Sequence, residues 1–257
     1  TWPLESIDGP LPDDYVERLI AYCTKAARES KQQTSWIHPH ADYEDGLQQF
    51  VRSLLDSTAS AEFLTDIRQI LKTIIRPGLA TAAAQVVLKT LSPGVPDFYQ
   101  GQELWDFSLV DPDNRRRVDM PLRARLLEES RRQYAAAPAA FVEGLFQEPA
   151  NPALKLFMTF RSLEIRREYA NLLQTGRYQA LEVTGPAAEH VIAFAWLPTD
   201  QTVTTDDALI VVAGRMWLKL WQTQNTGAEM TEWPPQGVWH DTSVILDGLP
   251  TERPLVN

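Results

Sequence analysis

The sequence has little cysteine and no long apolar run. Its one cysteine, Cys23, cannot form a disulfide within the chain, which is typical of proteins from a reducing compartment and predicts a cytoplasmic protein. The longest apolar runs, such as Ala208–Ala213, are far too short to cross a bilayer. The first residues show no basic segment followed by an apolar one. We therefore expect neither a signal peptide nor a membrane partner.

Positive charge is also scarce. The 257 residues include 24 Lys and Arg against 34 Asp and Glu, which gives a net charge of −10. An acidic surface repels phosphate backbones, so nucleic acids and anionic membranes are not expected partners. Hydrophobic residues make up 44% and charged residues 23%, as in a globular protein that can bury a core.

Motifs for metals and cofactors are missing. The run His38-Pro39-His40, followed by Asp42, has no second pair of ligands at metal-site spacing, so we interpret it as a structural or carbohydrate-contacting loop. Asp111-Pro-Asp113-Asn114 begins like a calcium loop, but Arg115 follows and the next position is not glycine. Glycine-rich phosphate loops and Cys-x-x-Cys pairs are absent. We expect no metal and no cofactor.

The first two thirds of the chain have helical periodicity. Apolar residues recur at three- and four-residue steps, and prolines and acidic residues stand near the expected helix starts. A helix that opens near Ser57–Ser60 should stop at Pro77-Gly78, because proline and glycine interrupt helices. The other helices are predicted at Pro12–Lys31, Ala41–Leu55, Leu79–Leu91, Pro121–Tyr134 and Pro152–Tyr169.

After Gly176 the pattern changes to β-branched and aromatic runs separated by Gly, Pro, Asp and Thr. Their spacing predicts an antiparallel sandwich or meander beyond a boundary near Leu173–Gly176. The fold class is therefore α+β, a helical block followed by an antiparallel β-sandwich. The predicted strands are Tyr178–Val183, His190–Leu197, Ala208–Ala213, Met216–Gln222 and Val238–Leu246.

A long segment between these patterns is the candidate site. Val95–Tyr99 is bracketed by prolines and glycines and predicts one short buried strand. Gln102–Met120 has no periodicity, and structureless loops of this length are usually functional. Carboxylates, arginines and aromatic rings crowd there, which is the set of groups that binds sugars. The alternative is a loop that only packs and pairs its own charges. Residue spacing leaves both open.

The sequence of this segment resembles a known family. Pro93–Arg116, which reads PGVPDFYQGQELWDFSLVDPDNRR, is similar to the signature of maltooligosyltrehalose synthases, members of the α-amylase superfamily. The same enzymes are also similar at Trp2–Glu5, at Thr34–Trp36 and in the helices between them. A weaker similarity at Trp239–Thr242 extends the resemblance over essentially the whole chain. Arg117 departs from the family, which commonly has proline after Asn-Arg-Arg. We expect this difference to change the rigidity of the loop.

The resemblance implies an isomerase of trehalose biosynthesis. The family converts the reducing-end α-1,4 linkage of a maltooligosaccharide into an α,α-1,1 linkage on a (β/α)8 barrel. On that plan residues 1–91 are a helical insertion. Residues 92–175 hold the last barrel strand, the active-site loop and the following helices, and residues 176–257 are a C-terminal β-sandwich, which we expect to be truncated.

The resemblance also implies which residues act. The family's three catalytic carboxylates lie on earlier strands, upstream of Thr1, so no catalytic residue is assigned and the chain alone is expected to be inactive. Its partners are then a maltooligosaccharide and the remainder of the catalytic barrel. Two alternatives remain: a stand-alone carbohydrate-binding or scaffold protein, and an α-amylase-type hydrolase. The predicted substrate-binding residues are Tyr99, Gln100, Glu103, Asp111, Asp113, Asn114, Arg115 and Arg116.

Overall fold

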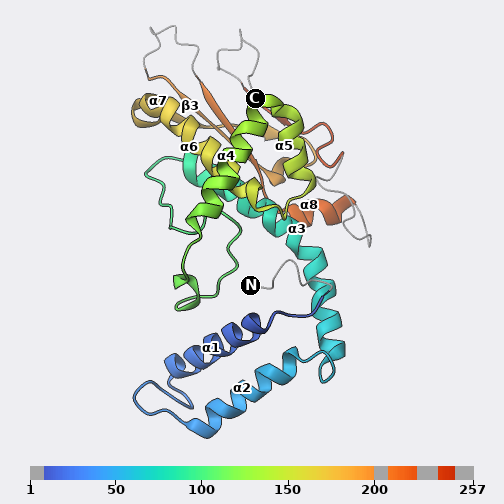
Figure 1. Ribbon diagram of the computed structural model, residues 1–257. Coiled ribbons are helices and arrows are strands. Elements are labelled where there is room, and N and C mark those ends of the chain that lie inside the picture. The colour runs from blue at the N-terminus through green and yellow to red at the C-terminus, as the bar shows by residue number, and fades with distance from the viewer. Residues whose placement is uncertain (1–8, 200–207, 225–236, 247–257) are drawn as a thin grey trace. The chain divides into compact units, whose positions relative to one another are not determined.

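The computed structural model describes residues 9–199, 208–224 and 237–246, and they pack into two compact units (Figure 1). The first unit combines the chain up to Thr73 with Asp106–Asp119. The second combines Ile74–Trp105 with the chain from Met120 onward. These units follow from packing alone. The predicted domain boundaries after residues 91 and 175 come from the family plan, and they stay a prediction.

The first unit is built on a helical hairpin, α1 (Asp13–Ser30) and α2 (Ala41–Leu55), as the periodicity predicts (Figure 1). Apolar side chains form its core, including Tyr15, Ile20 and Val51, each exposed by 6% or less. The Nδ1 atom of His40 accepts a hydrogen bond of 3.1 Å from the Tyr43 amide and so caps the start of α2. The His-Pro-His run therefore has a structural role at this helix start.

Helix α3 (Ala61–Leu91) corrects one prediction, because it continues through Pro77 instead of stopping there. A proline inside a helix removes one backbone hydrogen bond and costs about 3 kcal/mol. Beyond Pro77 the helix buries Leu79, Ala83 and Leu91 to 4% exposure or less. Burial of one large apolar side chain is worth about 2 kcal/mol, so tertiary packing outweighs the local interruption.

The strand expected at Val95–Tyr99 is also absent, since these residues are irregular. Val95 is 95% exposed and Tyr99 57% exposed. A strand needs a neighbour for its backbone hydrogen bonds, and no described strand pairs with this segment. The described residues thus contain no closed barrel. The segment expected to supply the last barrel strand is irregular.

Four helices follow in the second unit: α4 (Met120–Ala136), α5 (Pro138–Gln147), α6 (Pro152–Glu168) and α7 (Ala170–Thr175). Helices α4 and α6 confirm the prediction, whereas α5 was not predicted. An aromatic cluster joins α4, α5 and α6, with the Phe157 ring centroid 5.0 Å from those of Tyr134 and Phe141.

The β-structure of the described residues consists of two small antiparallel sheets. In the larger sheet, β3 (Val191–Leu197) lies between β1 (Arg177–Ala180) and β4 (Leu209–Gly214), and Tyr178 lies opposite Trp196. The smaller sheet pairs β2 (Val183–Thr184) with β5 (Ser243–Val244). Of the predicted sandwich, the described residues therefore form small antiparallel sheets only.

Strand β3 is buried on both faces. On one face Ala195 and Leu197 pack among other aliphatic residues, and on the other Phe194 and Trp196 pack against Leu91. The Trp196 indole Nε1–H donates a hydrogen bond of 2.8 Å to the Leu91 carbonyl oxygen. This bond satisfies a carbonyl at the end of α3 and fixes the point where the candidate site segment begins.

The strand predicted at Met216–Gln222 is a helix, α8 (Trp217–Gln224). The aromatic and aliphatic residues that suggested a strand also fit a helix, because Trp217, Leu220 and Trp221 stand at three- and four-residue steps. Leu220 and Trp221 are buried at 1% and 9% exposure. No helix in the described part of the chain is long and apolar enough to cross a membrane.

Candidate functional site

The start of the candidate segment is held by hydrogen bonds from helix α6. The Arg166 guanidinium donates hydrogen bonds of 2.6 Å to two carbonyl oxygens, those of Thr90 and Gly94. The Lys89 ammonium lies 4.0 Å from the centroid of the Phe98 ring. These contacts fix the chain on the N-terminal side of Tyr99 without using the Tyr99 side chain.

A second set of contacts holds the segment after Tyr99, and we call it the Gly101 clasp: Gly101, Glu103 and Arg123. The two Glu103 carboxylate oxygens accept hydrogen bonds of 3.1 and 3.2 Å from the Gly101 amide. Arg123 on α4 donates from Nε to Glu103, 2.7 Å, and from Nη2 to the Gly101 carbonyl oxygen, 2.6 Å. Gly101 has a φ of +99°, a conformation that favours glycine.

The charge state of Glu103 follows from this clasp. Burial alone raises the pKa of Glu103, but hydrogen bonds from Arg123 and from backbone amides outweigh burial and hold the pKa below its ordinary value of 4.5. Just beyond it, the Trp105 indole donates to the Asn151 carbonyl oxygen at 3.1 Å. The segment is thus anchored on both sides of Tyr99 and Gln100, whose side chains are exposed.

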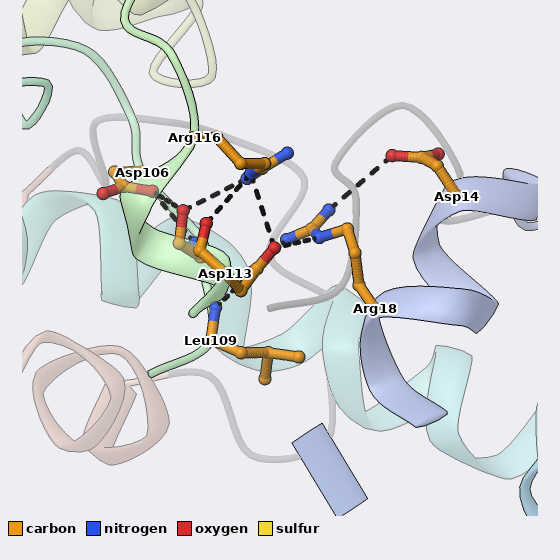
Figure 2. A network of polar contacts seen from close by, with 7 residues as sticks. Asp14, Arg18, Asp106, Leu109, Asp113 and Arg116 are labelled. Carbon is orange, nitrogen blue, oxygen red and sulfur yellow. Dashed lines mark hydrogen bonds and ion pairs between the residues drawn. The ribbon is translucent and has the colours of Figure 1, made fainter. Parts of the chain in front are cut away.

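The later half of the segment belongs to the first unit and centres on Asp113 (Figure 2). Its two carboxylate oxygens accept hydrogen bonds of 2.8 Å from Nε and Nη2 of Arg18, and the Leu109 amide donates a third of 2.7 Å. Arg116 Nε lies 3.4 Å from the same carboxylate. The Asp113 side chain is only 8% exposed.

These donors decide the charge of Asp113. Burial raises its pKa, but the hydrogen bonds from Arg18 and Leu109, together with the positive charge of Arg116, lower it below the ordinary value of 3.8. The carboxylate is therefore ionised at neutral pH, and its acceptor positions are largely taken up by protein groups.

Asp111 is held in a similar way. The Lys25 ammonium on α1 donates to the Asp111 backbone carbonyl oxygen and lies 3.3 Å from carboxylate Oδ2, while Arg115 pairs with Oδ1. Arg116 also donates to the Ser108 hydroxyl, 3.1 Å away. The ion pairs expected of a loop that braces itself are thus present. The Arg115 side chain is nonetheless 72% exposed.

The predicted site residues fall into two groups. Glu103, Asp111 and Asp113 are engaged by cations of the protein. Five side chains remain on the surface: Tyr99, Gln100, Asn114, Arg115 and Arg116. The eight positions are divided between the two units: Tyr99, Gln100 and Glu103 belong to the second unit and Asp111–Arg116 to the first.

Sequence reasoning missed the cations that hold these carboxylates: Arg18 and Lys25 on α1, and Arg123 on α4. Arg18 and Asp113 are 95 residues apart, and Lys25 and Asp111 are 86 apart, so no local pattern links them. The only available signal was the seven-residue spacing of Arg18 and Lys25, which puts both on one face of α1. Among the described residues, no group of three His, Cys, Asp or Glu side chains could hold a metal ion.

Comparisons with known proteins agree with the resemblance. No protein-family model matches the chain. A candidate maltooligosyl trehalose synthase of Mycobacterium tuberculosis, present in two strains, is 34% identical over 241 residues, which are 93% of this chain and 26% of the relative.

Solved structures give the same result. Maltooligosyltrehalose synthase from Arthrobacter ramosus matches with a TM-score of 0.63 and 31% identity, over 90% of this chain and 26% of that one. A glycosyltrehalose synthase matches with a TM-score of 0.51 and 29% identity, over 74% of this chain and 23% of that one. The chain is therefore homologous to maltooligosyltrehalose synthase, and it spans about a quarter of the length of these relatives.

Proposed function

We propose that this chain forms part of a maltooligosyltrehalose synthase, the isomerase that moves the reducing-end α-1,4 linkage of a maltooligosaccharide to an α,α-1,1 linkage. The observation that carries the proposal is 34% identity over 93% of the chain, together with the match to the Arthrobacter ramosus structure. Since the chain spans only 26% of these relatives, the activity requires residues outside it.

The carboxylates in the candidate segment support a role other than catalysis. A retaining glycosyl transfer needs a nucleophile and a general acid about 5 Å apart, and the acid needs a raised pKa. Glu103 and Asp113 have lowered pKa values and are bonded to arginines. They suit the fixing of a loop. The proposal therefore leaves the catalytic carboxylates outside this chain, with the remainder of the barrel.

The exposed side chains suit contact with a sugar. Tyr99 stands between two anchored stretches, so its ring can stack on the apolar face of a glucosyl unit with little loss of conformational entropy on binding. Gln100 offers an amide to sugar hydroxyls. In the other half of the segment Asn114, Arg115 and Arg116 offer donors, while Asp111 and Asp113 hold the backbone from which they project. The segment would also help to exclude water while the released glucose turns over.

Product analysis tests the proposed function. The natural, full-length protein that carries this sequence is incubated with maltopentaose, and the products are separated by chromatography. The proposal predicts a non-reducing, trehalose-capped pentasaccharide, and no such product from the 257-residue chain alone. Free glucose or maltose as the main product would instead indicate an α-amylase-type hydrolase. Binding without turnover would indicate a carbohydrate-binding or scaffold protein.

A further inference from the structure

Arg123 binds two different groups of the candidate segment, the Glu103 carboxylate and the Gly101 backbone carbonyl oxygen. Its Nε atom binds Glu103 and its Nη2 atom binds the Gly101 oxygen, while Glu103 accepts from the Gly101 amide. Both polar groups of Gly101 are therefore held by this cluster. An arginine can make both bonds at once because its donors form a planar fork.

The Gly101 clasp lies directly after the two exposed residues of the proposed sugar site. A backbone hydrogen bond of 3.2 Å from the Gln102 amide to the Tyr99 carbonyl closes a tight turn over Tyr99–Gln102, with Gly101 in its left-handed position. Loss of the bonds that hold the Gly101 peptide would therefore loosen the turn that carries Tyr99 and Gln100. The Arg123 side chain is only 15% exposed. Its hydrogen bonds therefore offset the cost of removing most of this charged group from water.

We infer that Arg123 is a positioning residue, which holds the Tyr99–Gln102 turn so that Tyr99 and Gln100 meet the maltooligosaccharide in one orientation. This inference rests on the proposed function. It assigns no sugar contact to Arg123 itself. Displacement of a binding group by about 1 Å can cost about a hundredfold in rate, so a residue that fixes a turn can matter as much as one that touches substrate.

The first experiment measures the turn directly, in the 257-residue chain. Amide hydrogen exchange is compared for Arg123→Ala, Arg123→Lys and the control Arg125→Ala, which changes an exposed arginine on the same helix. We expect faster exchange at Gly101 and Gln102 in Arg123→Ala, intermediate exchange in Arg123→Lys, and no change in the control. Lysine keeps the charge but lacks the fork that binds both partners. Unchanged exchange in Arg123→Ala overturns the inference.

The second experiment measures the consequence for the sugar, in the natural, full-length protein with maltopentaose. We expect kcat/KM for Arg123→Ala to fall about ten- to a hundredfold, with free glucose rising as a share of product, and Arg123→Lys to recover part of the loss. Thermal stability is recorded for each variant. A lower melting temperature with wild-type kinetics and partitioning contradicts the inference, because that result describes a purely structural bond.

Tyr99→Ala separates failure of this inference from failure of the proposed site. If Tyr99→Ala alters the kinetics but Arg123→Ala does not, the sugar contact stands and the positioning role is wrong. If both variants keep wild-type kinetics and product shares, Tyr99 is no sugar contact and the proposed site itself fails. Parallel losses in both variants, with Arg125→Ala unchanged, support both.

Discussion

The Arg18 guanidinium on helix α1 holds the Asp113 carboxylate through two hydrogen bonds of 2.8 Å, although 95 residues separate them in the sequence (Figure 2). The bond gives the 106–119 stretch a fixed attachment within the first unit. It also makes Asp113, which is 8% exposed, a support for the loop.

A double-mutant cycle should show this coupling. Arg18→Ala and Asp113→Ala each remove charged hydrogen bonds from a largely buried pair, so each should lower the free energy of unfolding by about 2 kcal/mol. The double variant should cost clearly less than the sum, by about 1 kcal/mol or more. Urea unfolding of the 257-residue chain measures all three.

The exposed pair Arg52–Glu17 provides the control, because its side chains are 51% and 59% exposed. Arg52→Ala should lower the free energy of unfolding clearly less than either Arg18→Ala or Asp113→Ala, because solvent screens an exposed ion pair. If the Arg18 and Asp113 effects are additive, the two residues do not stabilise one another and the loop is held by other contacts.

Acid should protonate Glu44 on α2 and so weaken its contacts with Arg28 and Thr34. Hydrogen bonds from Arg28, 2.8 and 2.6 Å, and from the Thr34 hydroxyl, 2.6 Å, lower its pKa from 4.5 to about 2. A carboxylate with a lowered pKa in the folded state stabilises the fold above its ordinary pKa. That stabilisation is lost as the pH falls from about 4.5 to about 2.

The measurement is the difference in unfolding free energy between the wild type and Glu44→Gln across pH 2–7. We expect a constant difference above about pH 5 that shrinks toward zero near pH 2. Asp45→Asn removes a charge from the next, exposed residue and should change the unfolding free energy by less than about 0.5 kcal/mol throughout. A wild-type–Glu44→Gln difference that does not depend on pH would show that the Arg28 contact does not set the ionisation of Glu44.

Pro77 should weaken helix α3. Pro77→Ala restores the backbone donor inside a 31-residue helix, so we expect a gain of about 1–3 kcal/mol in unfolding free energy. Pro138→Ala is the matched control, because Pro138 stands at the start of α5, where proline removes no helical bond. Equal effects of the two substitutions would mean that the backbone hydrogen bond missing at Pro77 does not weaken α3.

Much of this fold could be predicted where local patterns were strong. The apolar stripes of α1, α2, α4 and α6 and the β-branched and aromatic runs of β3 and β4 coincide with observed elements. Two of the errors share one cause, which is packing between residues that are far apart in the sequence. Pro77 is tolerated because residues beyond it are buried, and the aromatic run at Met216–Gln222 forms a helix because Leu220 and Trp221 fill a core.

The candidate segment shows the same limit. Its composition and its family motif pointed to residues 99–116, yet neither revealed that Arg18, Lys25 and Arg123 hold its carboxylates. Such ion pairs depend on tertiary structure that places distant helices beside the loop. Sequence separation of 86 or 95 residues leaves no periodic signal to detect.

We propose that Tyr99, on its anchored segment, contacts the maltooligosaccharide. The most direct test is the partitioning of maltopentaose between trehalose-capped product and free glucose by the natural, full-length protein, compared for wild type, Tyr99→Ala and Arg125→Ala. Arg125 is an exposed residue of α4 outside the proposed sugar site and serves as the control. We expect Tyr99→Ala to lower the rate of capped product about tenfold or to raise the glucose share, with a nearly unchanged melting temperature, while Arg125→Ala behaves as wild type. Wild-type rate and partitioning in Tyr99→Ala would contradict the proposed sugar contact.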